Sequence, residues 1–303
     1  MQIGIFASVA GSGGTLDQIV GTAAKAHDDG FASVWLPQIF GFESLSVLAI
    51  IGREIPDIGL GTGVVPTYPR HPVTMAQLAL TVQAAAGDRL TLGIGLSHQM
   101  VIENMYGMSF DHPASHMADY LAILMPLLRG EGVAHQGEAL SASMTLSVPA
   151  DVAAPAVVVA ALGPRMLDLA GRNTDGTVTW MTGPKTLAGH IVPSITAAAE
   201  AGGRGAPRVV AALPVCVTDD VDAARARCAE QFEMYGFLPS YRAMLDREGV
   251  DGPADVAIVG SADEVRSQIA ALADVGVTEF VAVEVGRRGA EYDATRDVLR
   301  SLL

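Results

Sequence analysis

Cysteine, aromatic residues and charged residues are all scarce in this chain of 303 residues. The two cysteines, Cys216 and Cys228, make neither a disulfide framework nor a metal site. The histidines show no metal-ligand spacing, so we predict no metal. Charged residues make up 17% of the chain and hydrophobic residues 50%, so a large core is easily supplied.

The chain also lacks a long hydrophobic run and an excess of positive charge. Its longest apolar run, Val152–Leu162, contains Pro155 and falls well short of the roughly 20 residues that span a bilayer. The net charge of −14 argues against nucleic acid or an anionic membrane as the main partner. A strand pattern begins at Met1 with no basic segment before it, so we expect no secretory signal and a cytoplasmic protein.

Short β-branched runs alternate regularly with amphipathic helical patterns, which is typical of parallel strands joined by helices. Eight runs predict strands: Gln2–Ser8, Ser33–Pro37, Ile58–Val65, Leu90–Gly95, Ala156–Ala161, Gly176–Trp180, Val209–Val217 and Glu279–Glu284. Helices are predicted between them: Leu16–Asp28, Ser44–Glu54, Val73–Ala86, Ser115–Leu128, Arg165–Arg172, Leu187–Ala201, Val221–Tyr235 and Ala262–Val275. The rhythm predicts a (β/α)8 TIM-type barrel with short insertions, forming a single domain over residues 1–303.

Two stretches interrupt this rhythm, and one loop suggests a rival architecture. Glu131–Ala154 is predicted to form a small hairpin, and Gly236–Ala254 an extra helix. Gly11-Ser-Gly-Gly14 follows the first strand as the phosphate loop of a doubly wound dinucleotide-binding sheet would. However, the third glycine of that motif would fall at Leu16, and no ribose-binding acid follows the second strand. We therefore favour the barrel.

Two segments after strands carry candidate chemistry. Gly163 ends a strand and Pro164-Arg165-Met166 opens a helix, where free backbone N–H groups and the helix dipole favour an anion. Ser97 and His98 follow the fourth strand, at the end where barrels display functional groups. His98 is a candidate for proton transfer or substrate orientation, or for a cofactor contact without a proton role. No G-x-S-x-G with a triad indicates a hydrolase.

The segments Gly61-Thr-Gly-Val-Val-Pro-Thr-Tyr-Pro-Arg-His-Pro72 and Gly87-Asp-Arg-Leu-Thr-Leu-Gly-Ile-Gly-Leu-Ser-His98 are specific. Together with Val34–Gln38, Gly163–Gly171 and Val259–Glu264 they resemble the bacterial-luciferase-like superfamily, in particular its deazaflavin F420-dependent branch. The resemblance implies a barrel with the cofactor ring over the strand ends and a cis Gly63–Val64 peptide. It further implies cofactor contacts from these residues: Gly63, Val64, Ser97, His98, Gly163, Pro164, Arg165 and Met166. Family members are commonly homodimers, which we expect here.

The site departs from related dehydrogenases at two positions. His98 stands where some of them have a carboxylate, and Pro37-Gln38 stands where one group has Asp-His. We predict His98, Gln38 and Glu43 as catalytic residues. The resemblance implies an F420-dependent oxidoreductase that transfers a hydride between the cofactor and a small organic substrate. The alternatives are an FMN-dependent monooxygenase and a non-catalytic cofactor-binding barrel.

Overall fold

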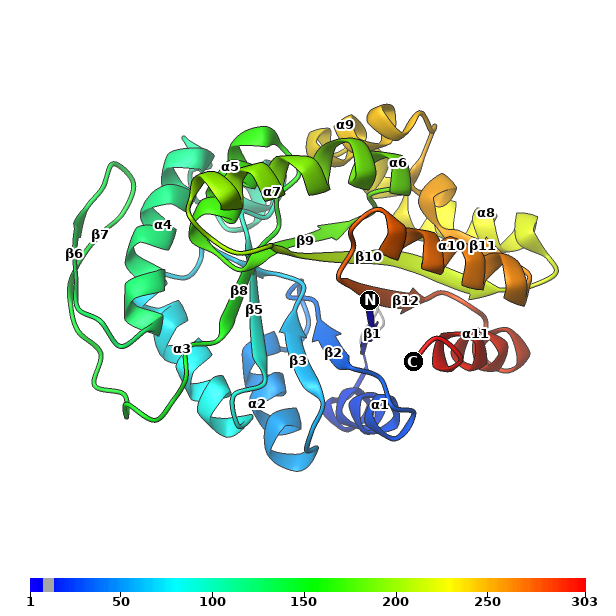
Figure 1. Ribbon diagram of the computed structural model, residues 1–303, viewed down its shortest axis with the longest axis horizontal. Coiled ribbons are helices and arrows are strands. Elements are labelled where there is room, and N and C mark those ends of the chain that lie inside the picture. The colour runs from blue at the N-terminus through cyan, green and yellow to red at the C-terminus, as the bar shows by residue number, and fades with distance from the viewer. Residues whose placement is uncertain (8–13) are drawn as a thin grey trace.

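Eight parallel strands close into a barrel at the centre of the molecule (Figure 1). The computed structural model describes residues 1–7 and 14–303. In order round the barrel the strands are β1 (Gln2–Phe6), β2 (Ser33–Leu36), β3 with β4 (Gly59–Thr62 and Val65–Pro66), β5 (Leu90–Gly95), β8 (Ala156–Val159), β9 (Gly176–Trp180), β10 (Arg208–Val217) and β12 (Glu279–Glu284). Each predicted strand occupies one of these positions, and the predicted barrel is confirmed.

The barrel is closed because β12 pairs with both β10 and β1, while β10 also pairs with β9. A doubly wound sheet would stay open, so this pairing excludes the rival architecture. Residues 11–13 of the glycine-rich loop lie outside the described residues. The third strand is interrupted between β3 and β4, where the Gly63–Val64 peptide bond is cis as expected.

Helices surround the barrel (Figure 1). Their bounds are α1 (Leu16–Asp28), α2 (Ser44–Glu54), α3 (Pro72–Ala85), α4 (Pro113–Leu128), α5 (Pro164–Asn173), α6 (Pro184–Thr186), α7 (Val192–Ala201), α8 (Val221–Phe232), α9 (Pro239–Glu248), α10 (Ala262–Asp274) and α11 (Ala290–Arg300). The Thr15 and Gln18 side chains form a capping box at the start of α1, and Glu43 caps α2. These local bonds explain why both helices begin at the predicted residues.

Several elements depart from the simple alternation. The predicted hairpin is present as β6 (Val133–Gln136) and β7 (Ser141–Met144), and the predicted extra helix is α9. The helix predicted over Leu187–Ala201 is divided by a π turn, η2 (Leu187–Ile191), before Pro193, whose nitrogen carries no hydrogen for the helical ladder. The short strand β11 (Ile258–Gly260), the π turn η1 (Val101–Met105) and the terminal α11 were not predicted.

The barrel interior is apolar toward the C-terminal ends of the strands and contains a charged network toward their N-terminal ends. Trp35, Val158, Val178, Val210, Ala212 and Val281 fill it. Toward the start of the strands the buried Glu279 carboxylate accepts hydrogen bonds from Ser33 Oγ (2.5 Å), Trp35 Nε1 (2.9 Å) and Arg208 Nη2 (2.8 Å). Arg208 Nη1 also donates to Thr91 Oγ1 over 3.0 Å. This network joins β2, β5, β10 and β12, leaving the opposite end of the barrel for a site.

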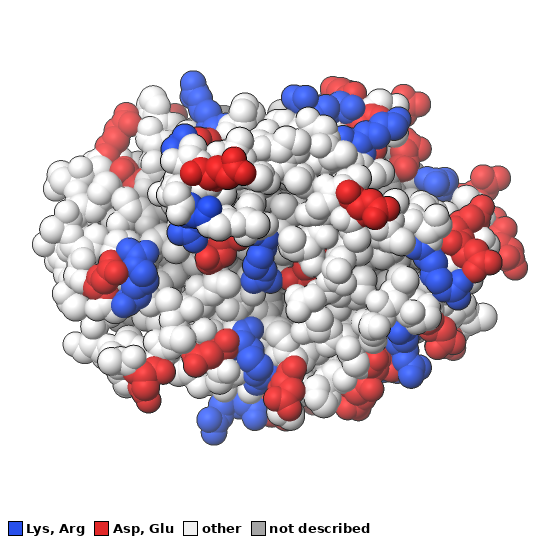
Figure 2. All heavy atoms as spheres, in the orientation of Figure 1, with Lys and Arg blue, Asp and Glu red and all other residues white. Residues whose placement is uncertain are grey.

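Charged side chains of both signs lie on the surface of the protein (Figure 2). In the described ranges, no helix has the length and apolarity to cross a membrane. On the face shown in Figure 2, basic side chains are interspersed with acidic ones and do not gather into a patch of their own.

Candidate functional site at the barrel mouth

A cavity of about 360 Å³ lies at the C-terminal ends of the barrel strands. Its lining includes Phe6, Val64, Ala160 and Trp180, which pack directly on the apolar cluster inside the barrel. This is the end of a TIM-type barrel at which active sites are built.

The cavity gathers residues from both segments singled out in the sequence. Seven predicted site residues line it: Gln38, Gly63, Val64, Ser97, His98, Gly163 and Met166. Three others, Glu43, Pro164 and Arg165, are not part of its described lining. The predicted set is therefore brought together in large part, although these contacts do not establish the role of any residue.

Glycines at the wall give the cavity its shape. A Cβ added to Gly63 would lie 2.6 Å from Phe6 Cζ, so only glycine lets this strand end pack against the ring. A Cβ added to Gly163 would meet nothing within 4 Å. Because Gly163 lines the cavity, a side chain there would take up ligand space. The absence of a side chain at Gly163 thus leaves room for a bound group close to the backbone.

His98 enters the cavity directly after an unusual backbone conformation. Ser97 has φ of 63°, in the left-handed region that non-glycine residues rarely adopt, and such residues concentrate at functional sites. The His98 carbonyl accepts bonds from the N–H groups of Val101 and Ile102, which begins η1. Burial lowers the pKa of the His98 imidazole, so the neutral ring predominates at neutral pH.

The two other predicted catalytic residues take different places. Gln38 Oε1 accepts the Ser44 N–H over 2.7 Å, so the amide oxygen is engaged and the Nε2 donor has no recorded partner in the described chain. Glu43 instead caps α2 by accepting from the N–H groups of Leu45 and Ser46. Arg70 Nη2 lies 3.4 Å from Glu43 Oε1. The Glu43 carboxylate thus holds a helix start and a loop together.

One wall of the cavity is aromatic, and of its residues sequence reasoning indicated Trp180 at a mouth loop but not Phe232, Tyr235 or Tyr241 as part of the site. Trp180, Phe232, Tyr235 and Tyr241 form a chain of ring contacts, with Tyr235 and Tyr241 edge to face at 5.0 Å. The Tyr241 ring lies 5.7 Å from that of His98. Burial raises the pKa of both tyrosines, with a smaller contribution from Tyr235 to that of Tyr241, so these phenols stay neutral donors.

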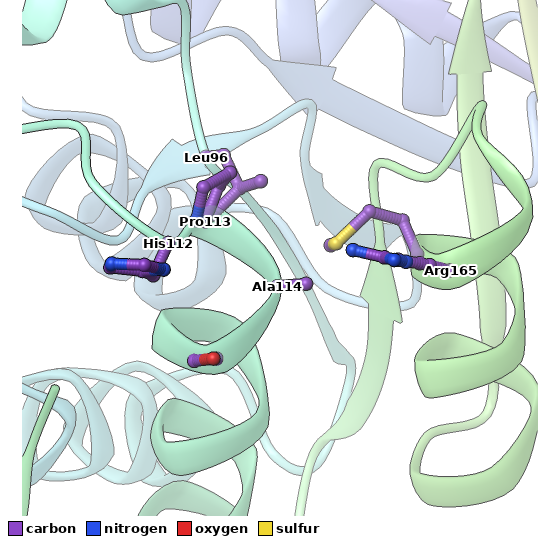
Figure 3. Close-up of a pocket in the computed structure, with 7 residues that line it drawn as sticks. Leu96, His112, Pro113, Ala114 and Arg165 are labelled. Atoms are coloured by element: carbon purple, nitrogen blue, oxygen red, sulfur yellow. The ribbon is translucent and has the colours of Figure 1, made fainter. Parts of the chain in front are cut away.

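A second, more open hollow adjoins the first, since Leu96 and Met166 line both. Figure 3 shows that Arg165, on the first turn of α5, faces it from one side, and Pro113 and Ala114, on the first turn of α4, from the other. Neither helix has a side-chain N-cap bond, and both have proline in their first turn. Two groups of free backbone N–H and one guanidinium therefore converge where an anion would be stabilised.

The contribution of α4 had a signal in the sequence. His112-Pro113 marks a helix start with proline in its first turn, as Gly163-Pro164 does, although the same dipeptide His71-Pro72 begins α3 with a side-chain cap from His71. The described residues contain no group of three or more His, Cys, Asp or Glu side chains that could hold a metal ion.

The chain belongs to the luciferase-like monooxygenase family, whose model matches residues 1–279. It is 28% identical over 292 residues to 5,10-methylenetetrahydromethanopterin reductase of Methanolobus tindarius, covering 86% of this chain and 88% of that one. The coenzyme F420-dependent tetrahydromethanopterin reductase of Methanopyrus kandleri has the same fold, with a TM-score of 0.82, 21% identity, and coverage of 99% and 97%.

An FMN-bound oxygenating constituent of 3,6-diketocamphane monooxygenase from Pseudomonas putida also shares the fold. Its TM-score is 0.75 at 19% identity, with coverage of 99% of this chain and 96% of that one. The family and fold thus bring this chain together with proteins that use either cofactor.

Proposed function

We propose that the protein is an F420-dependent oxidoreductase that transfers a hydride between the deazaflavin and a small organic substrate. The observation that carries the proposal is the pair of connected hollows. One is enclosed by apolar and neutral polar groups and suits a planar ring, and the other offers Arg165 and two uncapped helix starts to a phosphate. The 28% identity to a putative coenzyme F420-dependent oxidoreductase of Mycobacterium tuberculosis favours F420 over FMN.

Particular residues would hold the cofactor. Gly63, Val64 and Ser97 would lie against the ring, and the backbone of Gly163 and Met166 would lead to the phosphate, with Arg165 as its counter-ion. Pro164 starts α5 without an N–H of its own, so the N–H groups that the first turn offers to a phosphate are those of Arg165 and Met166. When bound, a deazaflavin supplies or accepts the hydride.

The chain's own residues would orient the substrate and move its proton. The Gln38 Nε2 donor would fix a substrate oxygen, because an amide donates a hydrogen bond without giving up a proton. His98 would transfer the proton, and Glu43 would position the loop that carries Gln38. A homodimer stays a prediction.

The experiment that tests the proposal is a binding titration with F420 and FMN in parallel. F420 should bind more tightly, and Arg165→Ala should weaken it by about 1–3 kcal/mol if the phosphate pairs with the guanidinium. Arg172→Ala is the matched control, because Arg172 lies on the same helix but pairs with Asp168 near its other end. Tighter binding of FMN would favour the monooxygenase. Cofactor affinity unchanged by Arg165→Ala would place the phosphate elsewhere.

A further inference from the structure

The cavity is notable for the charges that are missing from its wall. Among its described lining residues there is no Asp, Glu, Lys or Arg. Residues 8–13, which follow β1 and are not described, contain none in the sequence either. A charged group bound there would lose its hydration without gaining a counter-ion, which is strongly unfavourable.

The polar groups in the wall are neutral hydrogen-bonding groups. Besides Gln38 they include Ser97, His98, Tyr235 and Tyr241. The raised tyrosine pKa values and the lowered histidine pKa keep these side chains uncharged at neutral pH. Such a set can satisfy a carbonyl or hydroxyl oxygen, and it offers no opposite charge to a carboxylate, phosphate or ammonium group.

The outer edge of the same cavity is apolar and open to solvent. Ile39, Phe40 and Tyr106 line it with exposed fractions of 36%, 65% and 42%, and we call these three residues the apolar rim. Met100, Met105 and Met108 are exposed beside Tyr106. Exposed apolar side chains that gather at one place commonly mark a binding surface.

The volume of the cavity determines how much of it a substrate could occupy beside a bound cofactor. A cavity of about 360 Å³ lies near the lower end of the range of about 300–1,000 Å³ found for ligand sites. A bound tricyclic ring would take most of this space, so a second molecule must extend outward across the rim.

We propose that the second substrate is a neutral, apolar carbonyl compound whose hydrocarbon part lies on the apolar rim. This inference rests on the proposed function. A conjugated enone represents the class. Its β-carbon gains the hydride, its α-carbon gains a proton, the C=C bond becomes a single bond, and the reduced deazaflavin loses two electrons.

Two enones of equal length test the inference: a cyclohexenone with a pentyl chain and one whose chain ends in a carboxylate. Binding is followed by fluorescence of Trp180, with and without cofactor. Trp180→Phe identifies its signal by difference, because Trp35 is then the one tryptophan left in the chain. The neutral enone should bind at least about tenfold more tightly, because its pentyl chain covers apolar surface on the rim that a chain ending in a hydrated carboxylate would leave exposed.

A matched pair of variants locates the hydrocarbon part. Phe40→Ser should weaken binding of the pentyl enone by about tenfold. Phe42→Ser should leave it unchanged, because Phe42 is 54% exposed but does not line the cavity. Ile39→Lys should shift preference toward the carboxylate enone.

Equal or tighter binding of the carboxylate enone by the native protein would overturn the inference, as would equal effects of the two serine variants or no binding of the pentyl enone in either state. Failure of the proposed function would be seen separately, in the titration with F420 and FMN. Enone selectivity is also measured without cofactor, so it can fail or succeed whatever the outcome of that titration.

Discussion

At the scale of single residues, His98 has a backbone role and a side-chain role that can be separated. Its carbonyl begins η1, whereas its imidazole lies in the cavity against Tyr241 and has no recorded hydrogen-bond partner in the described parts of the chain. A substitution that keeps the backbone and the side-chain size should therefore leave η1 in place. Only the proton chemistry should change.

His98→Asn should reduce acceptor turnover by about 10²–10⁴-fold while cofactor affinity stays near native, if His98 transfers the proton. Burial lowers the pKa of His98, so the proton-donating form accumulates only below its ordinary value of about 6.5. Native kcat for reduction should therefore rise as pH falls through this acidic range, and the variant should show no such rise.

His27→Asn is a control for the loss of a titratable ring, because His27 lies near the end of α1 beside Asp28. Lost cofactor affinity with native turnover of the bound fraction would instead identify His98 as a cofactor contact. Solvent, Glu43 or Glu103, which lies on η1, would then be the next candidates for the proton.

At the scale of secondary-structure elements, one carboxylate fastens the β6–β7 hairpin to α4. Asp119 accepts hydrogen bonds from the N–H groups of Ala139 and Leu140 and from His135 Nε2, over 2.7, 3.2 and 2.9 Å. Burial acts to raise the pKa of Asp119, but hydrogen bonds from Ala139, His135 and Leu140 outweigh it, so the pKa lies below its ordinary value.

Asp119→Asn should lower the free energy of unfolding by roughly 1–3 kcal/mol, because the amide cannot accept all of these bonds. Asp168→Asn, in an exposed pair with Arg172, should change it by less than about 0.5 kcal/mol. The pKa of Asp119 is lower in the folded protein than in the unfolded chain, where it is near 3.9. The carboxylate therefore stabilises the fold above about pH 3.9, and this stabilisation is lost as the pH falls through the pKa of the folded state. Urea titrations at pH 6 and pH 3 measure both effects. Equal stability of the two variants at pH 6 would show that the hairpin does not depend on Asp119.

The elements that were predicted well have strong local signals. The bounds of α1 and α2 follow from caps within three residues of their first turns. By contrast, β11 is only three residues long and pairs solely with the end of β10, so no period is visible in its sequence. η1 begins with the His98 carbonyl accepting from residues three and four positions later, which any helical turn can do, so no particular residue type marks it in the sequence.

At the scale of the whole molecule, the charged network around Glu279 lies at the closed end of the barrel. Glu279 is 2% exposed, whereas the Arg208 side chain is 33% exposed. Removing the charge of one partner leaves the other poorly compensated, which costs about 3–5 kcal/mol for a buried pair. Because the Arg208 side chain is partly exposed, we expect a loss of stability at the lower end of this range.

Glu279→Gln should therefore destabilise the protein by roughly 3 kcal/mol in urea unfolding. The double substitution of Glu279 and Arg208 by Met should cost less, because no unpaired charge remains. Cofactor affinity should stay native, since neither residue lines the cavity. A single variant as stable as the native protein would show that the pair adds nothing to barrel closure.

Whole-molecule geometry also explains which site residues the sequence could indicate. Gln38, His98 and Gly163 lie two, three and four residues after the ends of their strands, and the closed barrel brings such positions to one mouth. Tyr235 and Tyr241 come from η3 (Glu233–Gly236) and α9, which fold back over the mouth from the segment after α8. Their direction depends on packing between distant elements, so no spacing in the chain predicts it.

The hairpin offers a way to handle the protein without obstructing its mouth. It lies on the outer side of α4 in Figure 1, and Glu138 at its turn is exposed. Cys216 and Cys228 are both buried. A cysteine introduced at position 138 would be the one accessible thiol, so a dye or an electrode surface could be attached at a single defined point on the flank. Immobilised in this way, every molecule would present its mouth to the solution in the same orientation.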